Sequence, residues 1–336
     1  KKIYSRMYQL IADAWYGKNC YDSALLYYKL AKDGFERIAD SAKISENLNN
    51  IGICYTISGN YDSAEHYFVK AIQVSKNIND SLGLKDLYQN IGNLYGDRAM
   101  IDEAATSYID ALKLNKLFND STGVLDIAGC LAYVFMSNND TTQADYYLDK
   151  GMSYISSSTP LISLAGFYCI KGEVEFLKGN YSAAKEWYHQ LIEVSERAKY
   201  KRGLAAGYSN MASVYSVEKD FERAVNYHKN ALIIEQDIGN VYGIINSLCL
   251  VSETYMASNS PRQAINFLSQ AYELSKDYGV NEHLTDITYN LYSANKVLGN
   301  TSLAIGFLEE YKDVYQRRSG SEVIEKVKEI EAKYEN

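Results

Sequence analysis

Proline is almost absent from this sequence, with only 2 in 336 residues, and runs of β-branched residues are short. Proline interrupts helices and β-branched residues favour strands, so their scarcity favours an all-helical chain. Long apolar runs are missing too, since none reaches the roughly 18 residues that a membrane-spanning helix needs. We therefore expect no transmembrane span in this segment.

The residues and motifs of common catalytic and metal sites are also scarce. The 5 cysteines are odd in number and form no CxxC pair, so neither a disulfide framework nor a zinc site is expected. The 4 histidines are not at ligand spacing, and the HExxH, GxSxG and phosphate-loop motifs are missing. We predict that the chain is not an enzyme and has no catalytic residue, cofactor or metal site.

An excess of positive charge is missing as well. The formal net charge is −8 and the isoelectric point is about 5.2. Direct nucleic-acid binding would require a clustered basic face. We therefore expect this segment to make no direct contact with nucleic acid.

What the chain does have is a repeat of 40 residues. The stretch 48–71 shows it most clearly, as two short helices with a break at Ser58-Gly59-Asn60. A small residue of the second helix returns in strict register, and an aromatic residue closes most first helices. The small residues are Ala24, Ala64, Ala104, Ala144, Ala184, Ala224, Ala264 and Ala304, and the aromatic residues are Trp15, Tyr55, Tyr95, Phe135, Tyr215 and Tyr255.

The spacing LxxIGxxY from Leu48 to Tyr55, followed by Ala64 and Phe68, resembles the tetratricopeptide repeat. The resemblance covers about the whole chain and implies an all-α fold, an α-solenoid of about eight helix-turn-helix units in a right-handed superhelix. The period is 40 rather than the standard 34, which implies longer helices. The expected units are about 1–40, 41–80, 81–120, 121–160, 161–200, 201–240, 241–280 and 281–316.

Some positions depart from the repeat. Glu175 replaces the aromatic residue of the fifth unit, and Tyr292 and Asn295 replace the small and aromatic residues of the eighth, so we expect looser packing there. In the segment 156–160, Thr159 is expected to cap a helix that has Pro160 at its first position. A flexible linker between two domains is the alternative.

The segment 317–336 follows the last unit. It is expected to form either a polar capping helix or the start of a coiled coil through which the chain could dimerise.

Function in such a solenoid is expected on the concave face, which the first helices line. An asparagine at one repeat position recurs four times, as Asn50, Asn90, Asn210 and Asn290, and could pair with a peptide backbone in either direction. This row is similar to the asparagine ladder of peptide-binding repeat proteins such as kinesin light chain and the Rap-type pheromone receptors. Bonding to neighbouring helices is the alternative. The candidate peptide-binding residues are Asn49, Asn50, Asp86, Gln89, Asn90, Asn93, Asp126, Tyr133, Ser209, Asn210, Ser213, Asn246, Asp286 and Asn290.

Carboxylates share another repeat position, at Glu46, Asp86, Asp126 and Asp286. They would make the groove acidic, so a basic or N-terminal peptide segment is the expected partner. A solvated acidic face is the alternative.

The long repeats and the charged end, with the sequence EAKYE at 331–335, resemble the sensor portion of membrane-bound regulators from Bacteroidetes. The resemblance implies a sensory region outside the cytoplasm, and the start at Lys1 fits a fragment or a processed chain. A stand-alone cytoplasmic peptide receptor or adaptor and a structural assembly subunit are the alternatives.

Overall fold

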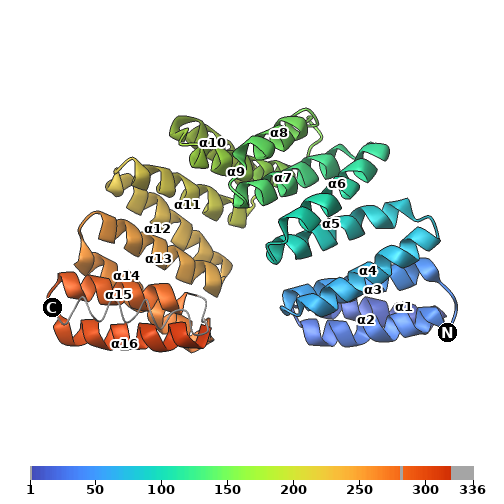
Figure 1. Cartoon of the computed structure of the whole chain (residues 1–336), viewed down its shortest axis with the longest axis horizontal. Helices are drawn as coiled ribbons and strands as arrows, with labels where there is room; N and C mark the ends of the chain where they lie inside the picture. The colour runs from blue at the N-terminus through green and yellow to red at the C-terminus, as the bar shows by residue number, and fades with distance from the viewer. Residues whose placement is uncertain (1, 281–282, 319–336) are drawn as a thin grey trace. The chain divides into compact units, whose positions relative to one another are not determined.

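The computed structural model describes residues 2–280 and 283–318, which form sixteen helices and no strand (Figure 1). The chain divides into two compact units, Lys1–Val174 and Glu175–Asn336. The helices that begin in unit 1 are α1 (Lys2–Tyr16), α2 (Tyr21–Glu36), α3 (Ser41–Ile57), α4 (Tyr61–Asn77), α5 (Ser81–Asp97), α6 (Ile101–Leu117), α7 (Ser121–Ser137), α8 (Thr141–Met152) and α9 (Leu161–Leu177). Those of unit 2 are α10 (Tyr181–Arg197), α11 (Lys201–Val217), α12 (Phe221–Ile238), α13 (Val241–Ala257), α14 (Pro261–Tyr278), α15 (Leu284–Val297) and α16 (Thr301–Arg318).

Consecutive helices pack against each other from α1 to α8 in unit 1 and from α10 to α16 in unit 2. The odd-numbered helices, which are the first helices of the hairpins, also meet: α3 contacts α5, α5 contacts α7, α11 contacts α13, and α13 contacts α15. Each hairpin thus buries its apolar side against its sequence neighbours, as in a helical solenoid. The predicted all-α solenoid is confirmed.

Successive turns are spaced twenty residues apart. In most turns a residue in the left-handed conformation comes last, and the next residue takes the N-cap position of the following helix. At the turn before α5, Asn79 has φ of 55° and the Asp80 carboxylate accepts a hydrogen bond of 2.9 Å from the amide of Gly83. Asp120 caps α7 in the same way. The Asn-Asp-Ser stretches at 79–81 and 119–121 thus cap their helices, because the aspartate side chain satisfies an amide that the helix leaves free.

The turn between α8 and α9 departs from this pattern. Helix α8 ends early, at Met152, and the segment 153–160 leads to α9. Pro160 directly precedes α9, whereas we predicted it at the first position of the helix. The Thr159 hydroxyl accepts a hydrogen bond from the amide of Ser156. The loop is therefore closed by its own hydrogen bonds.

The eight repeated alanines are all buried, with exposures between 0% and 4%. They let paired helices approach closely, and the first helices contribute small residues for the same reason. A Cβ atom added to Gly52 would lie 2.6 Å from the ring of Phe68, and one added to Gly92 would lie 2.7 Å from the ring of Tyr108. Only glycine fits at these two positions, because the second helix places a large ring there.

The departures from the repeat are accommodated without loose packing at the residues concerned. Tyr292 and Asn295 are 5% and 2% exposed, so the predicted looser packing is wrong there. The Asn295 side chain donates to the Leu291 carbonyl oxygen and accepts a hydrogen bond from Asn300. Local hydrogen bonds thus replace the missing aromatic residue.

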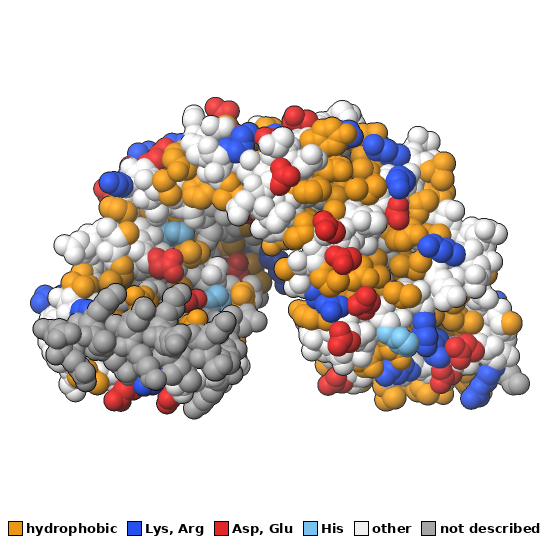
Figure 2. Space-filling model, in the orientation of Figure 1, with side chains coloured by type: hydrophobic (Ala, Val, Ile, Leu, Met, Phe, Trp, Pro, Cys, Tyr) orange, Lys and Arg blue, Asp and Glu red, His pale blue; other side chains and the backbone are white. Residues whose placement is uncertain are grey.

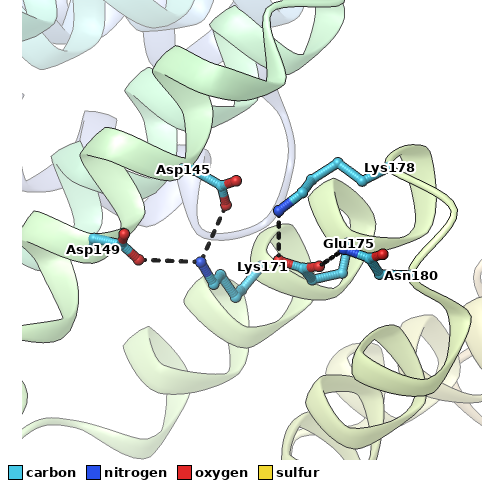
Figure 3. Close-up of polar contacts among 6 residues, drawn as sticks. All are labelled: Asp145, Asp149, Lys171, Glu175, Lys178 and Asn180. Carbon is cyan, nitrogen blue, oxygen red and sulfur yellow. Dashed lines mark hydrogen bonds and ion pairs between the residues drawn. The ribbon is translucent and has the colours of Figure 1, made fainter.

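Helix α9 carries charges at two core positions (Figure 3). Lys171 is 8% exposed and lies 3.2 Å from both Asp145 and Asp149 of α8, within unit 1. Glu175, also 8% exposed, accepts hydrogen bonds from Lys178 at 3.0 Å and from Asn180 at 2.8 Å, within unit 2. Buried charges need such partners, so the aromatic slot of the fifth hairpin is filled by a polar cluster.

Candidate functional site

We call the solvent-accessible side of α3, α5 and α7 in unit 1, and of α11, α13 and α15 in unit 2, the first-helix face. None of the fourteen predicted binding residues is buried. Asn49 and Asn50 lie on α3, and six other residues lie on the next two first helices of unit 1: Asp86, Gln89, Asn90 and Asn93 on α5, and Asp126 and Tyr133 on α7. The other six lie in unit 2: Ser209, Asn210 and Ser213 on α11, Asn246 on α13, and Asp286 and Asn290 on α15.

The asparagine row of unit 1 is partly used inside the protein. Asn90 of α5 donates a hydrogen bond of 2.9 Å to the side-chain oxygen of Asn49 on α3. Asn50 and Gln89 have no hydrogen-bond partner among the described residues and are only partly covered. The two pairs therefore differ: Asn49 and Asn90 join two first helices, whereas the amides of Asn50 and Gln89 make no such bond among the described residues.

Asn93 has a structural contact that sequence analysis missed. The hydroxyl of buried Tyr108 reaches from α6 to donate a hydrogen bond of 2.7 Å to the Asn93 side chain. Two repeats earlier, Tyr28 donates to Asp13 at 2.7 Å in the same way. The signal was present in the sequence, because a core tyrosine follows each of these polar residues by fifteen positions.

The predicted carboxylates of unit 1 differ in their contacts with other side chains. Glu46 is engaged, since Gln9 donates to it at 2.6 Å and Lys43 lies 2.5 Å away. Burial raises the pKa of Asp126, although a hydrogen bond with Ser163 opposes the shift. Figure 2 shows acidic and basic side chains interspersed over the helices of unit 1.

In unit 2 two carboxylates on neighbouring first helices interact electrostatically. Burial raises the pKa of Glu253 on α13, and the charge of Asp286 on α15 raises it further. The same two carboxylates and, above all, burial raise the pKa of the Cys249 thiol to about 12. Neither carboxylate forms an ion pair within the described part of the chain. The site therefore has an excess of negative charge that a cation would relieve.

The serines and asparagines around these acids complete the face of unit 2. The Ser213 hydroxyl donates to the backbone of Ser209 at 3.2 Å, and Asn210 already has an interaction partner. Asn246 and Asn290 have no hydrogen-bond partner among the described residues. The four-residue asparagine row thus does not act as one uniform set.

Two further searches cover only the described residues. No group of three or more His, Cys, Asp or Glu side chains there is placed to hold a metal ion. No described helix combines the length and apolarity that crossing a membrane would take.

Comparison with known proteins agrees with the packing described above. Residues 43–116 match the model of the tetratricopeptide repeat family. This chain contains tetratricopeptide repeats and folds as they do. No curated protein matches the repeat chain significantly.

Several solved structures share the fold of the tetratricopeptide repeat chain. The apo quorum sensor NprR from B. thuringiensis is 14% identical with a TM-score of 0.70, over 94% of this chain and 88% of that one. A signal transduction ATPase with a tetratricopeptide repeat sensor, from Pyrococcus horikoshii, is 14% identical with a TM-score of 0.64, over 87% of this chain and 46% of that one. A tetratricopeptide repeat protein from Parabacteroides merdae is 15% identical with a TM-score of 0.56, over 90% and 98% of the two chains.

Proposed function

We propose that the first-helix face binds a protein or an extended peptide, and that the chain acts by binding rather than by catalysis. The observation that carries the proposal is a set of accessible amides that have no hydrogen-bond partner among the described residues, which includes Asn50, Gln89, Asn246 and Asn290. Each amide offers both a donor and an acceptor, so it can bond a peptide backbone whatever the peptide's side chains.

The expected ligand is basic. Glu253 and Asp286 lie on neighbouring first helices of unit 2 and have no ion-pair partner in the described chain. Burial raises the pKa of Glu253, and the charge of Asp286 raises it further. Asp126 has a raised pKa in unit 1. A lysine, an arginine or a free N-terminal amine brought to these carboxylates would gain electrostatic energy and stabilise their charged forms.

The test uses two fluorescein-labelled pools of random peptides, one rich in lysine and arginine and the other rich in aspartate and glutamate. We expect fluorescence anisotropy to show binding of the basic pool. Two double variants should each weaken the affinity for the basic pool by about tenfold or more, equivalent to about 1.4 kcal/mol. They are Asn50→Ala with Gln89→Ala, and Glu253→Gln with Asp286→Asn.

The matched control is Asn230→Ala, which removes an exposed amide from the second helix α12. It should leave binding unchanged. Equal binding of both pools, or binding that survives both double variants, would rule out recognition by this face.

The more specific role that we propose is the sensory or interaction region of a larger signalling or transcriptional regulator. Two neighbours of similar fold are described as a quorum sensor and as a protein with a tetratricopeptide repeat sensor, which supports this proposal by analogy of fold. A stand-alone receptor or adaptor and a structural subunit are the alternatives. An apolar span of about 20 residues in the encoded chain after Asn336 would favour the membrane-bound regulator.

We also propose the division into eight units between residues 1 and 316. The helix pairs agree with it: α3 and α4 lie in 41–80, and α5 and α6 lie in 81–120. The proposed capping or coiled-coil helix of 317–336, and a dimer formed through it, fall almost wholly outside the described residues, which end at 318.

A further inference from the structure

Tyr133 of α7 is an exposed aromatic residue at a polar position of the repeat. It is 54% exposed and forms no hydrogen bond, ring stacking or cation–π contact among the described residues. Apart from Ile53, the residues at this position of the other repeats are polar or charged, and they are Asp13, Asn93, Glu173, Ser213, Glu253 and Ser293. The ring of Tyr133 is therefore available to another molecule.

Asp126 lies on the same side of α7 as Tyr133, because residues seven positions apart are separated by about two helical turns. Cys130 lies between them, and the charge of Asp126 acts on the Cys130 thiol. Helical side chains lean towards the N-terminus of their helix, so the tyrosine ring extends towards Cys130 and Asp126. Asp126 is partly accessible and has no ion pair among the described residues. An open ring and a carboxylate without an ion pair thus follow each other along α7.

A second carboxylate comes from the end of α5. The hydroxyl of Tyr108 on α6 interacts electrostatically with both Asp97 and Tyr133, so both lie near it. Asp97 is exposed and forms no hydrogen bond or ion pair among the described residues, yet burial raises its pKa. The surrounding protein thus removes part of the hydration of Asp97 while leaving it accessible. Burial raises the pKa of Asp126 as well.

No positive charge of the described chain neutralises these two carboxylates. Arg98 follows Asp97 directly in the sequence, but it forms ion pairs with Asp62 and Glu65 of α4. No lysine or arginine is among the described groups that shift the pKa of Asp97 or Asp126. The ring of Tyr133 is therefore accompanied by two carboxylates that lack a cation.

This combination matches the chemistry of a long basic side chain. Lysine and arginine have an apolar stem and a charged tip. The stem can pack against an aromatic ring, the cation is attracted to the face of the ring, and neighbouring carboxylates favour the charged form. A free N-terminal amine has no such stem, so it would use the carboxylates but not the ring.

We propose that Tyr133, together with Asp97 and Asp126, binds one lysine or arginine side chain of the peptide on the first-helix face. The inference rests on the proposed function, since it needs a peptide on that face. It goes further by naming Tyr133 as a residue that selects a basic side chain in unit 1.

The experiment uses the full 336-residue chain and the pool rich in lysine and arginine, now N-acetylated and labelled at the C-terminus. A matched neutral pool has norleucine for lysine and citrulline for arginine. Fluorescence anisotropy should show that Tyr133→Leu weakens binding of the basic pool about tenfold and that of the neutral pool by less than about twofold. Tyr133→Phe, which restores the ring, should recover the affinity for the basic pool to within about twofold of the parent.

The carboxylates are tested by Asp97→Asn with Asp126→Asn, which should also weaken binding of the basic pool about tenfold. The matched control is Tyr278→Leu, which removes a 64% exposed tyrosine from the end of the second helix α14 and should leave both affinities unchanged. Circular dichroism checks that each variant is folded.

The inference and the proposed function fail in different ways. The inference is overturned if Tyr133→Leu binds the basic pool as tightly as the parent, if it weakens both pools equally, or if only peptides with a free N-terminus bind. In each case the proposed function still stands when Asn50→Ala with Gln89→Ala weakens peptide binding. A parent chain that binds neither the acetylated nor the free basic pool overturns both.

Discussion

A buried histidine makes the stability of unit 2 depend on pH. His228 lies on α12 at the core position that Tyr28, Phe68, Tyr108 and Tyr188 occupy in other hairpins. Its side chain is 2% exposed, and its Nδ1 atom has no hydrogen-bond partner in the described chain. Burial lowers the pKa of His228 from 6.5 to about 4, because the charged imidazolium would lose its hydration.

The direction of the effect follows from this lowered pKa. Above pH 6.5 the imidazole is neutral in both the folded and the unfolded chain, so it costs no stability. As the pH falls from 6.5 towards 4, the unfolded chain binds the proton and the folded chain does not, so the free energy of unfolding decreases. With pKa values of 6.5 and about 4, the loss is about 2 kcal/mol at about pH 5.

The test compares the parent with His228→Phe by urea unfolding, followed by circular dichroism, at about pH 7.5 and about pH 5. Phenylalanine suits the slot, since Phe68 fills it in the second hairpin. It should be more stable than the parent at neutral pH by up to about 1 kcal/mol, because the unpaired Nδ1 is gone. It should also lose about 2 kcal/mol less between the two pH values.

The control for this experiment is His189→Phe, which changes an exposed histidine on α10. It should keep the pH dependence of the parent. If His228→Phe and the parent lose the same free energy on acidification, then His228 is not the buried neutral group described here.

Four further substitutions test the turns and the core by urea unfolding. Ala99→Gly should stabilise the chain by about 0.5–1 kcal/mol, because Ala99 has φ of 55° and glycine adopts this conformation without strain; a loss of stability would contradict the turn geometry. Gly92→Ala should cost about 1–3 kcal/mol, because its Cβ would meet the ring of Tyr108, whereas Gly166→Ala in α9 has open space and should gain up to about 1 kcal/mol. Equal effects of these two alanines would refute the close contact. Tyr108→Phe should cost about 1 kcal/mol by removing the hydrogen bond to Asn93, and an unchanged unfolding midpoint would show that this bond adds nothing.

The repeat itself could be predicted from the sequence, because its causes are local. The alanines at 40-residue intervals, the glycines beside large rings and the Asn-Asp-Ser caps each act within one hairpin or one turn. Asp80, for example, caps α5 through an amide only three residues away. Such contacts depend on spacing along the chain, so a sequence pattern records them directly.

Contacts between helices decide which polar residues form hydrogen bonds inside the protein. Asn50 and Asn90 occupy the same repeat position, yet Asn90 bonds Asn49 across two helices and Asn50 does not. The periodic pattern could not separate them, and it did not show that Asn93 is held by Tyr108 or that His228 fills an aromatic slot.

The amino-acid sequence alone thus determined that this protein is a series of helical hairpins with an accessible polar side. The tertiary structure decided which side chains of that surface are already paired and which can meet another molecule. The physical reason is the distance along the chain over which each contact acts. A turn or a helix depends on neighbours a few residues away, whereas a hydrogen bond between helices depends on the rotamers and separation of residues about forty positions apart. A repeat places these residues near each other without specifying their partners.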